Sequence, residues 1–525
     1  MIKTIFSVNT ARLINFQGTK TAKRYITGGH TNSSNESKLR TIRRRVAVAV
    51  CMLSATAIGL EHRRKVKCYE RHFEKVEKAD SHLTNYEESF QTAVENATEL
   101  LQRVKDETGC PGIVAAVGVN GRVMWSTGIG FADVENRVPC TKNTVMRIAS
   151  VSKPITVTLL AKLYEKGKLD LDKPVHEYVS AWPKSLKNDH GITITTRHLL
   201  SHLSGIRHYD KNPKKNKSVD EEAEKGQHKK PLKEKDGAND SGKAKEGSPT
   251  ENAKENTAAK TDQLKTEFNS KEHLSKRTFS SVTKSLELFK NDPLIYKPGT
   301  EYLYSTHAYT LLAAVAEVVG KRKLPEMLKT LFEDLEMKNT YLDQHEPIIY
   351  HRSRFYMRNT KGRLVNSPYV DVSYKWAGGG MLSTVGDLVK FGNAMLYSYQ
   401  HSDSSGISCE GKSGYLKQET VKMLWKPVVK TKKDFDSGMY YAMGWAVLPP
   451  PEDPKQWKEV RFQAQHTGGA IGCSSVLLVL PVKTPSSDRP LPQGVVVSIM
   501  TNLQGISLSE VAGQIAKEFE QFANK

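Results

Sequence analysis

The strongest constraint on the fold is an apolar run, Ile155 to Leu163, that directly follows Ser150-Val151-Ser152-Lys153-Pro154. A helix that is apolar on nearly all sides has to be buried in a core. Pro154 falls in the first turn, where a missing N–H costs no helical hydrogen bond. The sequence therefore predicts a buried helix that begins at Ser150.

Ser150 and Lys153 are candidates for a nucleophile and its base. Residues three apart lie on one helical face, so the Lys153 amine can approach the Ser150 hydroxyl. The N–H groups at a helix start also carry partial positive charge where an oxyanion would develop. The same Ser-x-x-Lys pattern recurs at Ser281 to Lys284, before an ordinary amphipathic segment. On pattern alone, a chance match at Ser150 stays open.

Tyr304 is a third candidate. Pro298-Gly299 turns the chain into Glu301 to Thr306, and an apolar helix follows from Leu311 to Val319. A phenol at this loop could relay a proton to or from Ser150 if nearby cations lower its pKa, which is ordinarily about 10. The alternative is a tyrosine that only packs against its loop.

A glycine-rich strand near the C-terminus is a candidate for substrate binding. His466, Thr467, Gly468 and Gly469 stand in sequence there, and glycines let a ligand lie close to the backbone and hydrogen bond to the strand edge. His466 would supply a polar or cationic group to the substrate. The alternative is a histidine in a turn that has no role in binding.

The N-terminal part of the globular body predicts a helix and then a hairpin. Apolar residues recur at helical spacing from Tyr86 to Thr108. Ile113 to Val119 reads as a strand, Asn120-Gly121 as a tight turn and Arg122 to Ser126 as the partner strand.

The C-terminal part predicts two more strands and a last helix. Ser474 to Leu480 and Val495 to Met500 are short apolar runs, and Ser507 with Glu510 forms a capping-box pattern before an apolar stripe. The order of elements predicts an α+β fold, an α/β sandwich. In it an antiparallel sheet is flanked by the terminal helices, and an α-helical region is inserted between the halves of the sheet.

The chain has 525 residues and a net charge of +21, and its charge and composition divide it into parts. Residues 211–271 are dense in Lys, Glu, Asp, Gly and Ser, and too few apolar residues occur there to form a core. We expect this stretch to be a disordered insertion within a hydrolase domain at 86–525, as a solvated loop or as a partner-binding or proteolytic-control segment. The basic excess lies in segments of this kind and not on a folded face with aromatics, so nucleic-acid binding is not expected.

Residues 1–67 have the composition of a mitochondrial presequence. Fourteen Lys and Arg stand there against Glu36 and Glu61, and the uncharged run Val46 to Leu60 is short for a transmembrane helix. A presequence followed by an apolar sorting segment predicts delivery to the intermembrane space or retention on the inner membrane. A buried helix at Val46 to Leu60 and delivery to the matrix are the alternatives.

The six cysteines form no C-x-x-C pair and no metal-ligand spacing with histidine, so we expect reduced structural thiols, no metal and no cofactor. Cys473 lies in the glycine-rich strand region, and a small buried residue is the interpretation preferred there.

The motifs in this order resemble those of the serine β-lactamase and penicillin-binding-protein superfamily, in its class C-like esterase and peptidase branch. Ser150 to Lys153 resembles the first motif, Tyr304-Ser305-Thr306 is similar to a Tyr-x-Asn motif, and His466-Thr467-Gly468 to a Lys/His-Thr-Gly motif. Thr195 to Gly205 and Gly378 to Thr384 are similar to further landmarks. Thr306 departs from the usual Asn and His466 from the usual Lys, which argues against antibiotic hydrolysis.

The resemblance implies a β-lactamase/transpeptidase-like fold and an acyl-enzyme formed on Ser150, with Lys153 and Tyr304 sharing the proton transfers. The N–H groups of Ser150 and Gly469 would hold the oxyanion. With the presequence and insertion, the chain looks most like the mitochondrial serine β-lactamase-like proteins of animals. That likeness implies an intermembrane-space peptidase that assembles into filaments and influences lipid metabolism. An esterase or lipid-acyl hydrolase, and a homo-oligomeric scaffold with little turnover, are the competing functions.

Overall fold

The computed structural model describes residues 85–182, 193–209, 272–402, 414–428, 438–449 and 461–524. The predicted presequence and sorting segment at 1–67 and the predicted insertion at 211–271 lie outside these residues. The chain divides into two compact units, Met1–Glu88 and Ser89–Lys525, and the second unit holds every strand of the described part.

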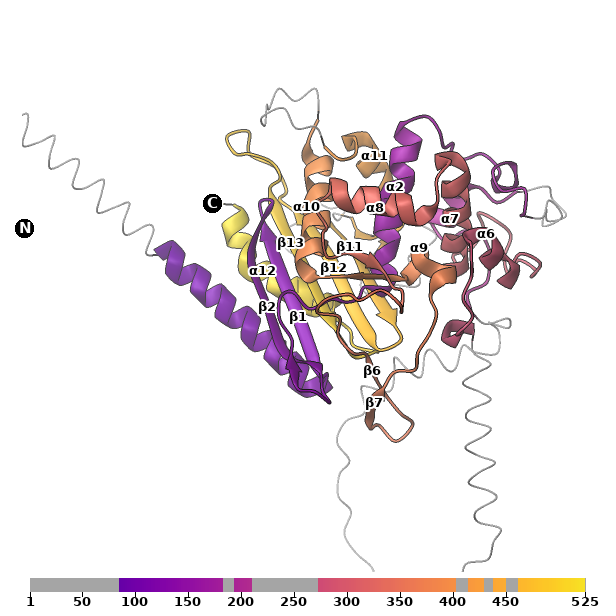
Figure 1. Cartoon of the computed structure of the whole chain (residues 1–525). Helices are drawn as coiled ribbons and strands as arrows, with labels where there is room; N and C mark the ends of the chain where they lie inside the picture. The colour runs from indigo at the N-terminus through magenta and orange to yellow at the C-terminus, as the bar shows by residue number, and fades with distance from the viewer. Residues whose placement is uncertain are drawn as a thin grey trace, which may run out of the picture. The chain divides into compact units, whose positions relative to one another are not determined.

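An eight-stranded antiparallel sheet with the order β3-β2-β1-β13-β12-β11-β10-β9 organises the second unit (Figure 1). Asn120 and Gly121 adopt positive φ angles of 49° and 80°, as the predicted tight turn between β1 and β2 requires. These strands are β1 (Gly112–Val119), β2 (Arg122–Asp133), β3 (Val138–Pro139), β9 (Tyr440–Tyr441), β10 (Ala446–Leu448), β11 (Gln463–Ala470), β12 (Cys473–Pro481) and β13 (Gly494–Thr501).

The sheet is buried on both faces, and its central strands β1, β12 and β13 are mostly apolar and buried at every position. In β1, Ile113, Ala115 and Val117 pack with the N-terminal helix (residues 85–108) and with α12 (Ser509–Ala523). Val114 and Ala116 point the other way, into the larger core with α2 (Ser152–Glu165) and α10 (Val385–Gln400). Figure 1 shows α12 and α10 on opposite sides of β1 and β13. The predicted α+β sandwich is confirmed.

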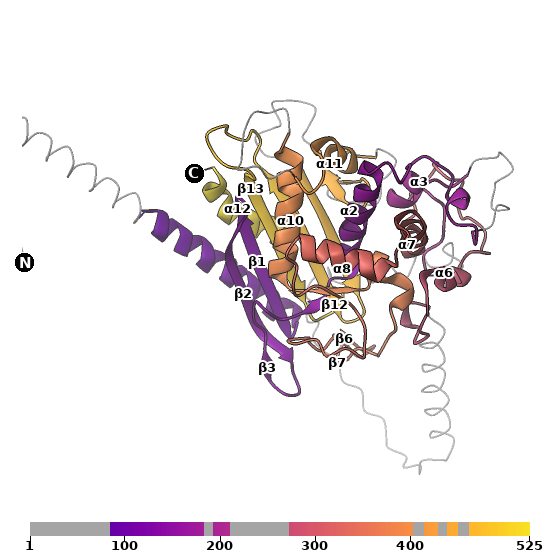
Figure 2. The same ribbon diagram turned by 45° about the horizontal axis from the view of Figure 1, so that its top comes forward.

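The helical region lies in sequence between β3 and β9, as predicted, and Figure 2 shows α2, α3, α6 and α7 together on the side of the sheet away from β1 and β2. Two small sheets accompany it. Among the described helices, none is both long and apolar enough to cross a bilayer. The remaining elements are α3 (Thr196–Leu200), α6 (Val282–Ser285), α7 (Thr306–Gly320), α8 (Leu324–Asp334), α9 (Trp376–Gly379), α11 (Gln418–Leu424), β4 (Met146–Arg147), β5 (Tyr341–Leu342), β6 (Tyr356–Arg358), β7 (Leu364–Asn366), β8 (Met381–Ser383) and the 3₁₀ turns η1 (Ala149–Val151), η2 (Val175–Glu177), η4 (Glu272–Leu274), η5 (Leu286–Leu288) and η6 (Ser373–Lys375).

The predicted capping box of the last helix is wrong. Helix α12 begins at Ser509 with Leu508 as its N-cap, and no side chain caps it. Leu508 already has near-helical backbone angles, so Ser507 lies one residue too early to act as the cap.

Arg207 joins the two segments that border the undescribed residues 210–271. Its side chain is buried, and it pairs with Glu272 at 2.8 Å and with Asp292 at 2.6 Å. On the same two segments the rings of Tyr209 and His273 lie 5.6 Å apart. We name the Arg207, Glu272 and Asp292 group the Arg207 clasp.

Candidate active site

Ser150 lies in a tight turn that leads directly into the buried helix. The turn is η1, and α2 follows from Ser152 with nearly all of its residues buried. Ala149 has φ 46°, a left-handed conformation that is uncommon for a residue with a side chain. Ser150 therefore lies in the turn that leads into α2, two residues before the helix begins at Ser152, and the prediction that the helix begins at Ser150 is wrong by these two residues.

Two polar side chains contact the Ser150 hydroxyl. The Lys153 Nζ lies 3.0 Å from the Ser150 Oγ, and it donates a hydrogen bond to the Gly378 carbonyl at 2.7 Å. The Tyr304 hydroxyl donates to the Ser150 Oγ at 2.7 Å. Residues far apart in sequence thus converge on one oxygen atom.

The Lys153 amine is completely buried and lacks an acidic partner among the described residues. Burial lowers the pKa of Lys153 well below its usual value, and the charge of Lys375 lowers it further. A neutral amine can direct an N–H to the Gly378 carbonyl and its lone pair to the Ser150 hydroxyl. Lys375 is also buried, and its Nζ contacts the Tyr209 hydroxyl at 3.3 Å.

Tyr304 keeps its proton. Burial raises the pKa of this phenol, and the hydrogen bond with Ser150 only partly opposes that effect. The Lys153 Nζ lies 4.6 Å from the centre of the Tyr304 ring. The expectation that nearby cations lower the pKa of this phenol, which was the condition for a proton relay, is therefore wrong. Tyr304 is a proton donor at neutral pH.

His202 holds the loop that carries Tyr304, and no separate role was predicted for this histidine. The backbone N–H of Ser305 donates to His202 Nδ1 at 3.2 Å, and the Leu303 N–H donates to the His202 carbonyl at 2.9 Å. The His202 ring lies 4.3 Å from the Tyr304 ring. Burial lowers the pKa of His202 well below its usual value, so its ring is neutral. The position of His202 within the landmark Thr195 to Gly205 was the sequence feature that could have indicated this role.

Strand β11 passes directly beside η1. A Cβ on Gly468 would lie 2.4 Å from the Ile148 carbonyl oxygen and 2.3 Å from the Ser475 hydroxyl, so only glycine permits this approach. A Cβ on Gly469 would meet nothing within 4 Å. Thr467 and Gly469 are exposed, whereas Gly468 is buried. The exposed edge of the strand beside Ser150 thus has room for a substrate backbone.

His466 is buried and neutral. Its Nε2 lies 3.1 Å from the Tyr441 hydroxyl, and its Nδ1 lies 2.6 Å from the Thr467 carbonyl oxygen. Burial and the neighbouring Lys153 lower the pKa of His466 to about 3. Of the two roles weighed for this residue, the cationic one is therefore wrong and the polar one remains.

The second Ser-x-x-Lys copy has a local structural role. The Ser281 hydroxyl accepts the backbone N–H of Lys284 and caps the short helix α6. Cys473 is fully buried in β12, as the preferred interpretation required. Within the described ranges, no three His, Cys, Asp or Glu side chains form a group that could hold a metal ion.

Known proteins are similar to this chain over most of its length. The sequence profile of the β-lactamase family matches residues 97–517. "Serine beta-lactamase-like protein LACTB, mitochondrial" from Mus musculus is 48% identical over 451 residues, which cover 82% of this chain and 81% of that protein. The protein of the same name from Homo sapiens is 47% identical over 446 residues, which cover 82% and 80%.

A solved structure supports the fold independently. The octameric penicillin-binding protein homologue from Pyrococcus abyssi aligns with a TM-score of 0.55 at 20% sequence identity. The alignment covers 82% of this chain and 77% of that chain. At this identity the likeness concerns the fold.

Proposed function

Because the chain belongs to the β-lactamase family, and within it to the serine β-lactamase-like proteins, we propose that it is a serine hydrolase that works through an acyl-enzyme on Ser150. The observation that carries this proposal is the double contact at the Ser150 Oγ, with Lys153 at 3.0 Å and Tyr304 at 2.7 Å. A base and a proton donor at one hydroxyl are the arrangement that nucleophilic catalysis needs.

Lys153 is the general base in the proposed mechanism. Its neutral amine takes the Ser150 proton as Oγ attacks the substrate carbonyl, and the Gly378 carbonyl holds the resulting ammonium. Tyr304 gives its proton to the leaving group, and His202 keeps the Tyr304 phenol in place. Water then attacks the acyl group and gives its proton to the Tyr304 phenolate, and the Lys153 ammonium returns its proton to the released Ser150 oxygen. Lys153 and Tyr304 thus share the proton transfers.

The glycine-rich strand binds the substrate in this proposal. The substrate backbone lies along the open edge at Thr467 and Gly469, and the N–H groups of Ser150 and Gly469 stabilise the oxyanion. His466, as a neutral ring joined to Tyr441, contributes polar contacts without a charge.

We favour amide bonds over esters as the physiological substrates. The nitrogen of an amide is a poor leaving group unless it is protonated, whereas the alkoxide of an ester leaves more readily. A buried phenol that keeps its proton next to the Ser150 Oγ meets that need. A peptidase is therefore the leading function, an esterase or lipid-acyl hydrolase is the second candidate, and a scaffold with little turnover is the third.

The remaining proposals concern location and assembly. The basic segment at 1–67 and the word "mitochondrial" in the names of the relatives support a mitochondrial protein, for which we propose the intermembrane space. Residues 86–525 form the proposed hydrolase domain, interrupted at 211–271. We propose assembly into filaments and an influence on lipid metabolism from the family resemblance, and inner-membrane association from the apolar run Val46 to Leu60.

Covalent labelling tests the nucleophile. We expect a fluorophosphonate probe to add one adduct to the full-length protein, on the peptide that contains Ser150, as measured by mass spectrometry. Ser150→Ala should lose the adduct entirely. Ser152→Ala is the matched control, because Ser152 is buried two residues away, and its Oγ has no hydrogen-bond partner.

The outcomes separate the three candidate functions. Labelling of Ser150→Ala, or no labelling of the parent protein, in protein with unchanged circular dichroism would remove Ser150 from the mechanism and favour the scaffold. If Ser150 is labelled, the kcat/KM values for an amide and an ester of the same acyl group distinguish a peptidase from an esterase.

A further inference from the structure

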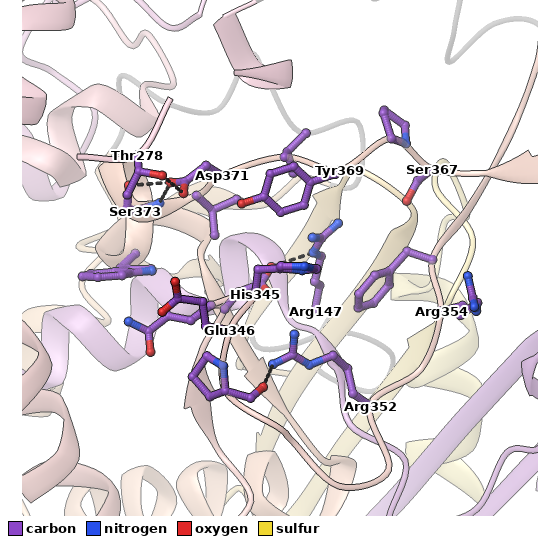
Figure 3. Close-up of a pocket in the computed structure, with 18 of the residues that line it drawn as sticks. Arg147, Thr278, His345, Glu346, Arg352, Arg354, Ser367, Tyr369, Asp371 and Ser373 are labelled. Atoms are coloured by element: carbon purple, nitrogen blue, oxygen red, sulfur yellow. Dashed lines mark hydrogen bonds and ion pairs between the residues drawn. The ribbon is translucent and has the colours of Figure 1, made fainter. Parts of the chain in front are cut away.

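A cavity of about 750 Å³ lies beside the candidate active site, and Ser150, Lys153 and Tyr304 do not line it. Its volume is typical of pockets that bind small molecules, roughly 300 to 1,000 Å³. Figure 3 shows Arg147 near its middle, Arg352 below, Tyr369 above and Arg354 apart at one side. Aromatic side chains contribute to its wall at Phe279, Phe355, Tyr369 and Trp376.

The arginines of the cavity differ in how their charges are compensated. Arg147 pairs with Asp343 at 2.7 Å, and Arg354 pairs with Asp133 at 3.1 Å. Arg352 has no ion pair among the described residues, and its guanidinium donates one hydrogen bond, to the Pro347 carbonyl at 3.3 Å. Asp343, which pairs with Arg147, favours the charge of Arg352 without forming an ion pair with it.

Some buried polar atoms of the wall also lack hydrogen-bond partners. The Arg352 Nε, the Ser353 Oγ and the Trp376 Nε1 are buried without a hydrogen-bond partner among the described residues. Buried polar groups are nearly always paired in proteins, so three such atoms on residues that line one cavity are unusual. Burial also lowers the pKa of Arg352, a cost that a bound anion would offset.

The carboxylates of the cavity wall do not form an ion pair with Arg352. Asp343 is already paired with Arg147, and the Asp371 carboxylate accepts hydrogen bonds from Thr278 and Ser373. Glu346 lies on the exposed rim, where water solvates its charge.

From this arrangement we propose that the cavity binds a small organic anion, with its carboxylate or phosphate on Arg352 and its apolar part against Phe355 and Tyr369. Arginine forms paired, charge-assisted hydrogen bonds with both kinds of anion. The Arg147 guanidinium lies 4.3 Å from the centre of the Phe355 ring, which fixes that aromatic surface next to the anion.

The cavity is joined to the candidate active site by backbone. Arg147 precedes Ser150 by three residues. Trp376 begins α9, whose Gly378 carbonyl holds Lys153, and the Asp343 N–H donates to the Gly380 carbonyl at 2.8 Å. A bound anion therefore contacts the elements that position the nucleophile and its base.

Calorimetric titration of the full chain tests the proposal, with phenyl phosphate and phenylacetate as probes. Inorganic phosphate lacks the apolar part and phenylacetamide lacks the charge, so both should bind more weakly. Arg352→Gln should weaken binding of the better probe by about tenfold or more, because charge-assisted hydrogen bonds are lost. Arg354→Gln is the matched control, since its side chain is half exposed and paired with Asp133 and Glu135, and it should bind normally.

Each outcome decides the proposal. Preference for phenyl phosphate identifies a phosphate ester as the ligand class, and preference for phenylacetate identifies a carboxylate; both support the site. Failure of both probes to bind, equal binding by Arg352→Gln, or an equal loss in Arg354→Gln would overturn it. Should Arg352→Gln not fold, Arg352→Lys keeps the charge but loses the Nε donor and the paired geometry, and weaker binding is expected there too. Because the readout is binding, its failure leaves acyl-enzyme formation on Ser150 untouched.

Discussion

The burial of Lys153 reduces the stability of the fold at neutral pH. Burial lowers its pKa in the folded protein, whereas in the unfolded chain a lysine titrates near about 10.4. Between these two pKa values the unfolded state binds more protons, so the free energy of unfolding rises with pH across that window. A group held in this way at neutral pH is destabilising, which is typical of a residue kept for chemistry.

Lys375→Met should move the acid limb of the pH profile. In the proposed mechanism, kcat/KM rises as pH rises through the pKa of Lys153. Removing the charge of Lys375 raises that pKa toward its usual value, so the limb should shift to higher pH. Lys329→Met, at an exposed position on α8, is the control. An acid limb that stays in place in Lys375→Met would show that Lys375 does not influence the base.

At the scale of elements, the site depends on how closely β11 approaches η1. Gly468 allows the strand to contact Ile148 and Ser475 directly, and the neighbouring Gly469 faces open space. Two adjacent glycines therefore have different roles, the first for packing and the second for access.

Gly468→Ala should separate the strand from the turn and lower both stability and activity. Inserting a methyl group into a packed site typically costs about 1 to 3 kcal/mol. Gly469→Ala should leave the free energy of unfolding within about 0.5 kcal/mol of the parent, because nothing lies within 4 Å of its Cβ. Urea unfolding measures both, and equal destabilisation of the two variants would contradict this assignment.

The sequence predicted those parts of the site that local pattern encodes. The apolar run after Lys153 predicted helix α2, the Asn120-Gly121 turn predicted the first hairpin, and the order of motifs identified the family correctly. His202 and Lys375 were not recognised, because their roles come from contacts with segments distant in sequence. The neutral state of His466 and the raised pKa of Tyr304 were missed for the same reason, since both follow from burial.

At the scale of the whole molecule, the Arg207 clasp leads us to expect that the fold does not depend on the segment between the two borders that it joins. Arg207 and Glu272 hold the two borders together at 2.8 Å, whatever number of residues lies between them. The entropic cost of a flexible loop grows only slowly with its length, about 0.6 kcal/mol for each doubling.

Replacing residues 211–270 by a short Gly-Ser linker should therefore preserve the fold. We expect an unchanged Tm within a few degrees and unchanged fluorophosphonate labelling of Ser150. Arg207→Met in the full chain should lower the Tm clearly, since Glu272 and Asp292 would lose their buried partner. A linker variant that unfolds would show that the replaced residues contribute to the core.

The pairing of the first long strand with the last one determines when this chain can fold. Strand β1 lies against β13, and the Gly112 N–H donates to the Asn502 side chain, 390 positions away. A polypeptide that emerges N-terminus first, from a ribosome or through a membrane pore, exposes the apolar β1 for as long as β13 has not emerged. Such a chain stays extended during passage and depends on chaperones until its final residues arrive.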